Sequence, residues 1–357
     1  MKKITLQTIA EHLNVSKALV SKALSNDPAV SDVTKELIWK TAKEMGYPIK
    51  SSRKVVPASK TGTLAVVMPR GYMQDFQYWG KILGGIDEEL SKYSFSMLLS
   101  SIDTSIVQAK DGLPASIHEG KIDGVIVLGH IPDNYIYALK EKNYPFVMVD
   151  SNVQDPTVEH ILSNNSQGAQ QAVKLLLDAG HRKLAFVGDI SSAWSFAERY
   201  RGFEQAVREA VEAGCKGIET VRVEGVGVSG NGNYTSPEFA KALSRCIHRD
   251  DPVTAYFCAN DMLAMETQSA FAAMGVSCPQ DVSIVGFDDL SISALTQPKL
   301  TTVKVPKTEM GKRAVELVLH RISHPEAWPE LVLLSTFLVE RDSVRSILGD
   351  EGNLTVS

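Results

Sequence analysis

Residues 15–26, VSKALVSKALSN, predict a short amphipathic helix. Apolar side chains recur in this stretch at the three- and four-residue spacing that places them on one face of a helix. The positions expected to face inward are Val20, Ala23 and Leu24. The positions expected to face outward are Lys17, Ala18, Ser21 and Lys22. A helix that carries cationic and small side chains on its outer face is suited to contact with an anionic partner.

A second apolar stripe lies directly upstream and predicts another short helix. Its members are Leu6, Ile9, Ala10 and Leu13. The turn between the two helices is expected at residues 14–16, where the Ser16 hydroxyl can accept a free backbone N–H of the second helix. Two short helices joined by a tight turn form a helix-turn-helix, whose second helix fits the major groove of DNA. The alternative interpretation is an ordinary pair of helices in a core.

A third helix completes this N-terminal unit. Asp27 and Pro28 interrupt the pattern, and the next helix is expected to begin after a Ser31 cap and to run to Met45. Gly46 is a natural stop, because glycine accepts the left-handed conformation that ends many helices. The side chains expected to fill the small core include Leu6, Ile9, Val20, Leu24, Ile38, Ala42 and Met45. We therefore assign residues 1–48 to a helix-turn-helix DNA-binding domain.

The distribution of charge supports contact between this unit and DNA. The 357 residues carry a formal net charge of −5. Residues 1–60 hold 11 Lys/Arg against 5 Asp/Glu, a balance of +6, so the remainder carries −11. A basic head on an acidic body is the asymmetry expected when one end of a protein meets phosphates.

Composition narrows the class of protein. With 44% hydrophobic and 22% charged residues, the chain has the composition of a soluble globular protein of two or three domains. No run of about twenty apolar residues predicts a membrane span, and the N-terminus lacks the apolar segment of a signal peptide, so a cytoplasmic location is expected. The cysteines have no metal-ligand spacing, and we expect neither a metal ion nor a cofactor. They are Cys215, Cys246, Cys258 and Cys278.

Residues 49–61 are rich in Ser, Pro and Lys and have little capacity to form a core, which predicts a linker. One interpretation is a flexible, solvated segment. The other is a hinge that becomes ordered on DNA, with Lys50, Arg53 and Lys54 near phosphates. Val56, or its neighbour Val55, would then press into the minor groove as an apolar wedge.

From Leu64 onward, buried strands alternate with amphipathic helices, which predicts an α/β fold of parallel sheets covered by helices on both faces. The pattern restarts after residue 162, so two lobes are expected. A helix at 106–119 and one continuous strand at 331–344 are among the expected elements. The expected division is 62–162 with 292–325 for the N-terminal lobe, 163–291 with 326–345 for the C-terminal lobe, and 346–357 for a tail. Ligands of such sheets bind beyond the carboxyl ends of the strands.

Several motifs, in this order, resemble those of the LacI/GalR family of bacterial repressors, and the resemblance covers nearly the whole chain. They are TLQTIAEHLNVSKALVSKALSN (5–26), VTKELIWKTAKEMGY (33–47), LLLDAGHRKLAFVGD (175–189), ERYRGFEQA (198–206), FCANDMLAM (257–265), CPQDVSIVGFDDL (278–290) and LTTVKVPKTEMGKRAVELVLHRI (300–322). The resemblance implies a helix-turn-helix head, a hinge and a two-lobed body of the type I periplasmic-binding-protein kind. It also implies a homodimer that binds a pseudo-palindromic operator and a small effector held between the lobes.

The resemblance assigns roles to residues of the head. Base-reading positions fall on Lys17, Ala18 and Lys22; a lysine can donate to guanine, and an alanine methyl can contact thymine. Positions that cap the helix or contact phosphate fall on Ser16 and Ser21. The family usually has threonine where this chain has Leu19, which removes one expected phosphate contact.

The hinge departs from the family pattern. Lys50 stands where the family has asparagine, and Val56 stands where it has the leucine wedge. Pro57 follows and stops any helix. These departures weaken the case for a hinge helix that kinks DNA.

The resemblance also places an effector site between the lobes. Its expected members are Tyr78, Trp79, Asn164, Ser195, Arg199, Tyr234, Asn260 and Asp288. Aromatic faces at Tyr78 and Trp79 suit the apolar face of a sugar or base, and Arg199 offers a fork of donors. Simple packing is the alternative for Trp79 and Tyr234, and a structural ion pair is the alternative for Arg199 and Asp288. A carbohydrate effector is expected, with a nucleobase as the alternative.

Three other signals are weaker. GVGVSG at 225–230 matches G-x-G-x-x-G, but the next helix is expected only near residue 236, too far to hold a pyrophosphate at the glycines. Asp288 and Asp289 are adjacent, so their side chains should point apart. His181 is expected to be a polar turn residue.

A ligand-controlled repressor without enzymatic activity is therefore the favoured function. Two alternatives remain: a solute-binding protein with a vestigial head, and an α/β enzyme with a fused regulatory head.

Overall fold

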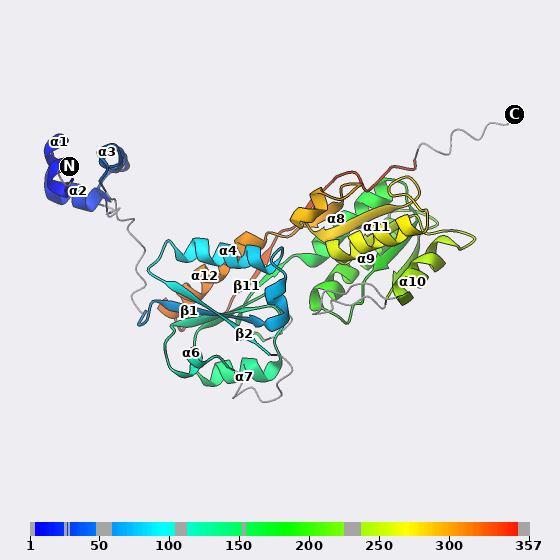
Figure 1. Cartoon of the computed structure of the whole chain (residues 1–357), viewed down its shortest axis with the longest axis horizontal. Helices are drawn as coiled ribbons and strands as arrows, with labels where there is room; N and C mark the ends of the chain where they lie inside the picture. Colours follow the sequence, from blue (N-terminus) through cyan, green and yellow to red (C-terminus); the bar gives the residue numbers. More distant parts are fainter. Residues whose placement is uncertain are drawn as a thin grey trace.

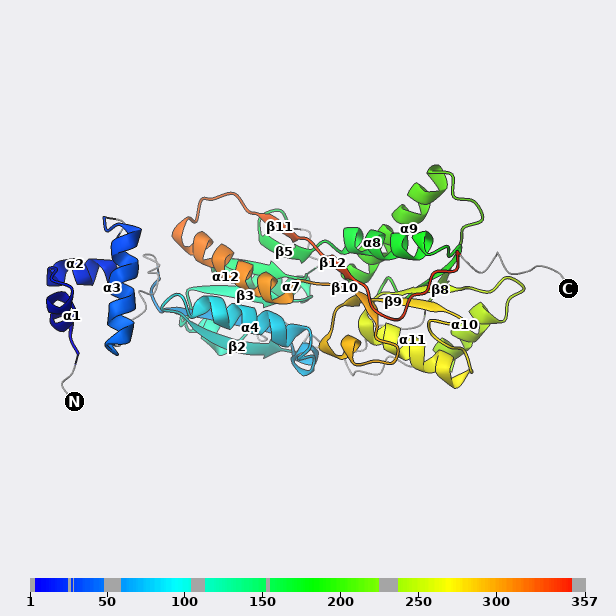
Figure 2. The ribbon, with the colours of Figure 1, turned by 90° about the horizontal axis from the view of Figure 1, so that it is seen from above.

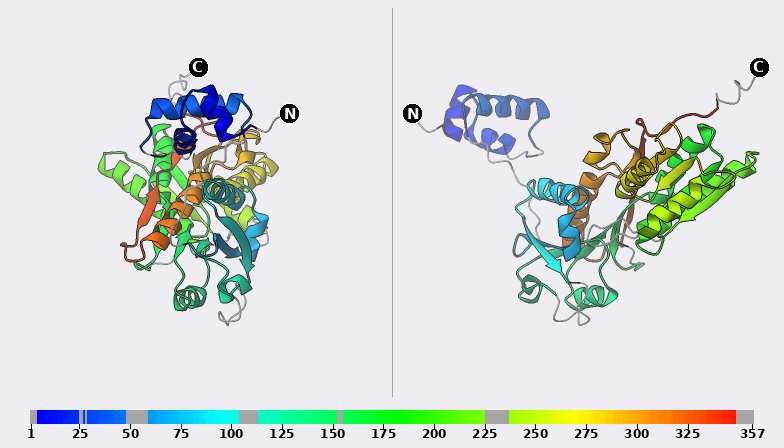
Figure 3. Two further views of the ribbon diagram at one scale, coloured as in Figure 1. Left: turned by 90° about the vertical axis from the view of Figure 1, so that its left-hand side faces the viewer. Right: turned by 45° about the vertical axis from the view of Figure 1, so that its right-hand side comes forward.

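The computed structural model describes residues 4–24, 27, 29–47, 59–103, 113–151, 155–224 and 237–348. A small helical head stands at one end, and two α/β lobes follow it in line (Figure 1). The two lobes are of similar architecture, each with a central sheet between helices (Figure 3). The α/β fold class and the head-plus-two-lobes organisation predicted from the sequence are confirmed.

The head consists of three short helices. They are α1 (Leu6–His12), α2 (Lys17–Leu24) and α3 (Asp32–Glu44). Its core includes the predicted inward-facing side chains of α2. The buried core residues are Ile9, Ala10, Val20, Ala23, Leu24, Val30, Ile38 and Ala42. Ser31 caps α3 by accepting the N–H of Thr34 at 3.3 Å, as expected from the sequence. Gly46 has φ +71° just after α3, which confirms the predicted stop.

A six-stranded parallel sheet forms the first lobe, in the order β11-β5-β4-β3-β1-β2. Its strands are β1 (Thr63–Pro69), β2 (Ser96–Ile102), β3 (Gly124–Leu128), β4 (Phe146–Val149), β5 (Glu159–Ser163) and β11 (Leu331–Leu334). Strands β1, β3 and β4 are buried along almost their whole length, because helices cover both faces of the sheet.

The helices of the first lobe divide between the two faces of this sheet. One face is covered by α4 (Trp79–Leu90) and α12 (Lys307–Ser323), and the other by α6 (Ala115–His118) and α7 (Asp133–Glu141). A short 3-10 helix, η1 (Arg70–Gln74), follows β1. Helices α4 and α12 lie side by side (Figure 2). A Cβ on Gly85 of α4 would come within 2.1 Å of the Thr308 carbonyl oxygen, so this close approach of the helices requires glycine.

The second lobe contains another six-stranded sheet, in the order β12-β10-β9-β8-β6-β7, in which only β12 is antiparallel to its neighbour. Its strands are β6 (Lys183–Val187), β7 (Glu219–Val223), β8 (Ala255–Cys258), β9 (Ser283–Asp288), β10 (Thr301–Lys304) and β12 (Phe337–Val339). Its helices are α8 (Asn165–Asp178), α9 (Trp194–Glu212), α10 (Pro237–Ile247), α11 (Asp261–Ala273) and the 3-10 helix η2 (Ser291–Ala294). Helices α8 and α9 cover one face, and α10 and α11 cover the other (Figure 2).

The chain crosses between the lobes three times, after β5, after β10 and after β11. The first and third crossings are joined, because the Thr336 hydroxyl donates to the Asn164 carbonyl at 3.1 Å and the Asn164 N–H donates to the Leu334 carbonyl at 2.8 Å. This pairing places two of the three connections side by side.

The positions of the second and third crossings correct the division expected from the sequence. Residues 301–304 were expected in the first lobe, but they form β10, which pairs with β9 of the second sheet. Residues 331–334 were expected in the second lobe, but they form β11, which pairs with β5 of the first sheet. The single strand expected at 331–344 is also wrong. It is two short strands in different sheets, separated by the third crossing.

Part of the predicted helix at 106–119 lies outside the described residues, and its described end forms α6 at 115–118. Most of the expected tail, from residue 349, also lies outside them. Among the helices of the described ranges, none is both long and apolar enough to cross a membrane.

Candidate functional site

The outer face of α2 is exposed. Val20, Ala23 and Leu24 are buried, and the predicted outward-facing residues Lys17, Ala18, Ser21 and Lys22 are all exposed. The Ser16 hydroxyl accepts the Leu19 N–H at 3.1 Å, so Ser16 acts as the predicted cap. Leu19 itself is half-buried against the core of the head. The residues expected to read DNA bases therefore share one accessible surface.

Packing within the head fixes the orientation of α2. The indole N–H of Trp39 on α3 donates to the Ala23 carbonyl at 3.2 Å, near the end of α2. Asn14, in the turn before α2, has φ +53°, a conformation that asparagine tolerates better than most residues. The expected hinge residues lie outside the described residues, and their roles stay predictions. They are Lys50, Arg53, Lys54 and Val56.

The most elaborate cluster of polar side chains lies where the carboxyl ends of the two sheets meet, and we call it the interlobe junction. Its centre is Arg199 of α9, which is 2% exposed. The guanidinium donates to Asn165 Oδ1 at 2.9 Å, to the Ala259 carbonyl at 2.6 Å and to Asp288 Oδ1 at 3.1 Å. It also lies 3.8 Å from the ring centroid of Phe287. Arg199 thus connects the ends of β8 and β9 with the start of α8.

Asp288 ends β9 and sits in an unusual environment. Burial raises the pKa of its carboxyl to about 6, although Arg199 and Lys307 act in the opposite direction. Its backbone has φ +110°. The ammonium group of Lys307, at the start of α12, donates to the Asp288 carbonyl oxygen and lies 5.6 Å from the ring centroid of Tyr78. Lys307 thereby joins α12 of the first lobe to the end of a strand in the second.

A second buried carboxylate, Asp261, supports this strand end. It is fully buried at the start of α11. Its Oδ2 accepts the Leu290 N–H at 2.8 Å and the Ser293 hydroxyl at 2.6 Å, and its Oδ1 accepts the hydroxyl of Thr302. Burial, followed by the charge of Asp288, raises the pKa of Asp261 to about 7. Asp261 holds the segment after β9 against β10, which fixes the backbone at Asp288.

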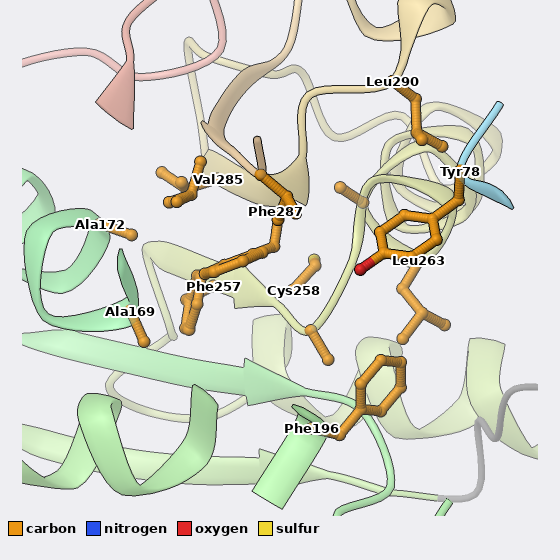
Figure 4. Packing of buried hydrophobic residues seen from close by; sticks show 14 of the residues in the cluster. Tyr78, Ala169, Ala172, Phe196, Phe257, Cys258, Leu263, Val285, Phe287 and Leu290 are labelled. Carbon is orange, nitrogen blue, oxygen red and sulfur yellow. The ribbon is translucent and has the colours of Figure 1, made fainter. Parts of the chain in front are cut away.

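The first lobe contributes Tyr78 and Asp150 to the junction. The Tyr78 hydroxyl donates to Asp150 Oδ2 at 2.8 Å, and Asp150 Oδ1 is buried without a hydrogen-bond partner in the part of the chain that the structure describes. Burial and the negative charges of Asp150 and Asp288 raise the pKa of Tyr78 well above its usual value. The Tyr78 ring also joins the apolar cluster that contains Leu263 and Leu290 of the second lobe (Figure 4). Tyr78 therefore lies at the boundary between the lobes, where its pKa responds to Asp150 of the first lobe and to Asp288 of the second.

Other predicted effector residues have structural partners. Asn164 caps α8 by accepting the Gln167 N–H at 3.1 Å, and Asn260 caps α11 by accepting the Leu263 N–H at 2.9 Å. Trp79 is buried and stacks on Tyr72, with ring centroids 4.8 Å apart.

Ser195 and Tyr234 are the remaining two predicted effector residues. Ser195 is half-buried in the first turn of α9, and Tyr234 lies outside the described residues. The structure thus brings Tyr78, Arg199 and Asp288 together; the effector-binding role of all eight predicted residues stays a prediction.

Sequence analysis missed four residues of the junction: Asn165, Lys307, Asp150 and Asp261. The sequence held a signal for two of them, Asp150 and Asp261. Asp150 directly follows the buried strand β4, as Asp288 ends β9, and Asp261 directly follows Asn260 after β8. A carboxylate after a buried strand, at the edge where parallel strands end, is a recurring mark of a binding site.

His181 corrects a further expectation. It was expected to be a polar turn residue, but it is a core residue that is 1% exposed. Its ring contacts the hydroxyls of Thr254 and Ser283, each at 2.9 Å, and the Arg345 carbonyl at 3.2 Å. Burial lowers the pKa of His181 to about 4. The uncharged ring therefore links three segments of the second lobe through hydrogen bonds.

Two other observations bear on ligands. Within the described ranges, no three His, Cys, Asp or Glu side chains are grouped so that they could hold a metal ion. A pocket of about 320 Å³ lies at the other end of the second lobe, between the end of α8, the start of β10 and residues 340–346.

The GVGVSG stretch at 225–230 lies outside the described residues.

Comparison with known proteins agrees with this architecture. A model described as "Bacterial regulatory proteins, lacI family" matches residues 5–48, and one described as "Periplasmic binding protein-like domain" matches residues 173–344. The chain is 29% identical over 349 residues to a probable HTH-type transcriptional repressor, ExuR, of Bacillus subtilis (strain 168), covering 96% of this chain and 99% of that protein.

Two solved structures show the same fold. A complex of the transcriptional regulator CelR with cellobiose has a TM-score of 0.66 and 24% identity, covering 95% of this chain and 99% of that chain. A lac repressor dimer bound to operator and the anti-inducer ONPF has a TM-score of 0.62 and 23% identity, covering 96% of this chain and 100% of that chain.

A helix-turn-helix head with an exposed basic face, followed by a two-lobed body of the periplasmic-binding kind, defines a class of DNA-binding transcriptional repressors. Both parts are present here in a single chain and in the expected order. The chain belongs to the LacI family of bacterial regulatory proteins.

Proposed function

We propose that this protein is a homodimeric operator-binding repressor whose affinity for DNA is set by a sugar held at the interlobe junction. The observation that carries the proposal is the buried Arg199–Asp288 pair, at 3.1 Å, beside Tyr78 of the opposite lobe. A molecule that contacts these groups would touch both lobes at once. Such a molecule changes the balance between lobe arrangements whenever it binds one arrangement better than another.

The chemistry of the junction favours a polyhydroxylated ring. Asp288 can accept hydrogen bonds from ligand hydroxyls, and Asp150 Oδ1 is a buried acceptor that has no partner among the described residues. Leaving such an acceptor unpaired costs on the order of 1–3 kcal/mol, and a ligand hydroxyl would recover this cost. Tyr72, Tyr78 and Trp79 form an aromatic group beside these carboxylates, and aromatic rings are side chains of the kind that pack on sugars. The CelR relative has cellobiose bound within the same fold.

The head is the part of the protein that we propose binds operator DNA. Lys17, Ala18 and Lys22 are exposed on one face of α2, where each can reach base edges in a major groove. Ser16 and Ser21 lie beside them near the expected path of the phosphates, and Lys50, Arg53, Lys54 and Val56 are proposed to contact DNA from the linker. The lac repressor structure with the same fold is a dimer on its operator.

The proposed mechanism is geometric. Two heads of a dimer bind half-sites about one helical turn apart, so both fit only when their spacing matches the operator. Movement between the lobes that displaces the heads by a few ångströms would break this match. The junction is the place where a ligand can set that movement, because Lys307 of the first lobe donates there to the Asp288 carbonyl of the second.

A thermal-shift screen of the full-length protein tests the proposal. The panel should contain neutral pentoses and hexoses, cellobiose, hexuronates and purines. A concentration-dependent rise in Tm with a sugar is expected, since a ligand that binds only the folded state stabilises it. The same sugar should change binding to DNA from the upstream region of the gene. A rise in Tm with purines alone would show that the effector is a nucleobase and not a sugar. The absence of DNA binding at low salt would overturn the repressor function.

A further inference from the structure

The described end of the linker is fastened to the first lobe by a single carboxylate, that of Asp123. Its Oδ2 accepts the Ser59 hydroxyl at 2.8 Å and the Gly62 N–H at 2.7 Å. Its Oδ1 accepts the N–H groups of Lys60 at 2.8 Å and Thr61 at 3.0 Å. Four consecutive residues thus donate to one side chain.

Asp123 lies just before the start of a strand in the first sheet, next to the strand that follows the linker. Asp123 directly precedes β3, and the strand that follows the linker, β1, pairs with β3 from Leu64 and Gly124 onward. The Asp123 N–H donates to the Thr63 carbonyl at 2.8 Å, which continues this pairing to the sheet edge. This is the amino edge of the sheet, opposite to the interlobe junction at the carboxyl edge. The linker therefore leaves the body at a point fixed to the middle of the first sheet.

The turn that surrounds Asp123 is firmly defined. Gly62 has φ +65°, and a Cβ there would lie 2.9 Å from the Ser94 carbonyl oxygen, so only glycine fits without displacement. The Ser59 hydroxyl also accepts the Gly62 N–H at 3.1 Å. Burial alone would raise the pKa of Asp123, but the hydrogen bonds from residues 59–62 outweigh it and lower that pKa below its usual value. Hydrogen bonds to an ionised acceptor are about twice as strong as neutral ones.

We propose that Asp123 is a positioning residue that clamps the linker to the first lobe, so that movement of this lobe reaches the DNA-binding head. This inference rests on the proposed repressor function. The chain runs from the clamp directly into the linker and then into the head, so the clamp sets where each head is tethered. Releasing residues 59–62 would add about 13 Å of extended chain to each tether. A longer tether lowers the effective concentration of one head at its half-site once the other is bound.

The test is Asp123→Asn in the full-length protein. Asparagine keeps the size of the side chain but turns one acceptor into an N–H group that faces the N–H donors of the linker. Hydrogen exchange at Lys60, Thr61 and Gly62 should become faster, which reports release of the clamp directly. Operator affinity, measured by fluorescence anisotropy, should fall by about tenfold, and the change in operator affinity caused by the effector should shrink by about fivefold. Effector affinity, measured by calorimetry, should stay unchanged.

Asp155→Asn is the matched control. Asp155 is another carboxylate of the first lobe that holds a local turn, since it accepts the Thr157 N–H at 2.9 Å and the Thr157 hydroxyl at 2.6 Å and pairs with Lys140. It makes no contact with residues 59–62 in the described structure. This variant should lose similar stability but keep the operator affinity and effector response of the wild type.

A second variant, Gly62→Ala, disturbs the same turn from the linker side and should reproduce the Asp123→Asn result even if that variant folds poorly. Wild-type operator affinity and effector response in both variants would overturn the clamp while leaving the repressor function in place. If Asp155→Asn lost as much of the effector-induced change in operator affinity as Asp123→Asn, the effect of Asp123 would be one of general stability. That result would also overturn the clamp. Failure of the wild-type protein to bind DNA would instead overturn the proposed function, and the clamp with it.

Discussion

Arg199 and Asp288 form a buried ion pair in which the arginine is more constrained than the carboxylate. Besides Asp288, the guanidinium contacts an amide oxygen of Asn165, a backbone carbonyl at Ala259 and the face of Phe287. All of these contacts depend on a planar group that donates in several directions. A lysine at this position could keep the charge but not the geometry.

Arg199→Lys should therefore lower both stability and effector binding. Two directional hydrogen bonds and the ring contact are lost, and the remaining charge is poorly paired in a buried site, so the free energy of unfolding should fall by about 2–4 kcal/mol. Urea denaturation measures this loss, and the thermal shift caused by the effector should disappear. Arg182→Lys is the control, because among the described residues Arg182 donates to the backbone carbonyls of Leu177 and His181, away from the junction. A normal thermal shift in Arg199→Lys would contradict the proposed site.

Two adjacent glycines of α4 predict opposite effects of the same substitution. At Gly85 a Cβ would lie 2.1 Å from the Thr308 carbonyl oxygen, whereas at Gly84 no atom lies within 4 Å of the added Cβ. Gly85→Ala should push α12 away from α4 and destabilise the protein by about 1–3 kcal/mol. Gly84→Ala should stabilise it by up to about 1 kcal/mol, because alanine favours the helix. Thermal unfolding of the two variants, side by side, would refute this packing argument if both moved Tm in the same direction.

The buried ring of His181 predicts a loss of stability in mild acid. Its pKa of about 4 in the folded state lies below the ordinary value of 6.5, so between these values the unfolded chain binds a proton that the folded chain does not. The free energy of unfolding should therefore fall as the pH drops through this window, by about 3 kcal/mol, and level off below it. Comparison with His181→Gln isolates this effect, because the variant cannot titrate there. Parallel pH profiles for the two proteins would show that His181 is not responsible.

Lysines in the head and in the linker should differ in what they contribute to DNA binding. Lys17→Ala should remove a contact with a base edge and weaken binding to the preferred operator by about 1–3 kcal/mol while binding to unrelated DNA changes little. Lys54→Ala should weaken binding to every sequence alike and reduce the salt dependence by about one phosphate contact. Anisotropy titrations on operator and scrambled DNA at several salt concentrations distinguish the two. Uniform weakening by Lys17→Ala would show that this side chain contacts the backbone instead.

Local patterns predicted the head and most of the strands. The inner and outer faces of α2, the Ser16 and Ser31 caps and the Gly46 stop all follow from spacing and from the chemistry of single residues, and the structure confirms them. Strands such as β3 were predictable because both of their faces are buried, so their sequences are continuously apolar.

The failures occurred where tertiary contacts override local patterns. Strand β5, EHILS, was missed because Glu159 and His160 are buried beside partners distant in sequence, Arg321 among them. The apolar run from 331 to 339 looks like one strand, and only its pairing shows that it passes from one sheet to the other. Asp123 and His181 are polar residues whose roles depend on donors and acceptors that fold back onto them, so single-sequence analysis could not find them.

The three crossings also determine how late in synthesis each lobe can finish folding. The head is continuous in sequence and is complete once residue 47 has left the ribosome. When residue 300 emerges, neither sheet is finished, because the first still lacks β11 and the second lacks β10 and β12. Both lobes close only as the last fifty or so residues arrive. A premature stop before residue 331 would release a polypeptide with a finished DNA-binding unit and two unfinished lobes with exposed apolar surface, prone to aggregation rather than to unregulated repression.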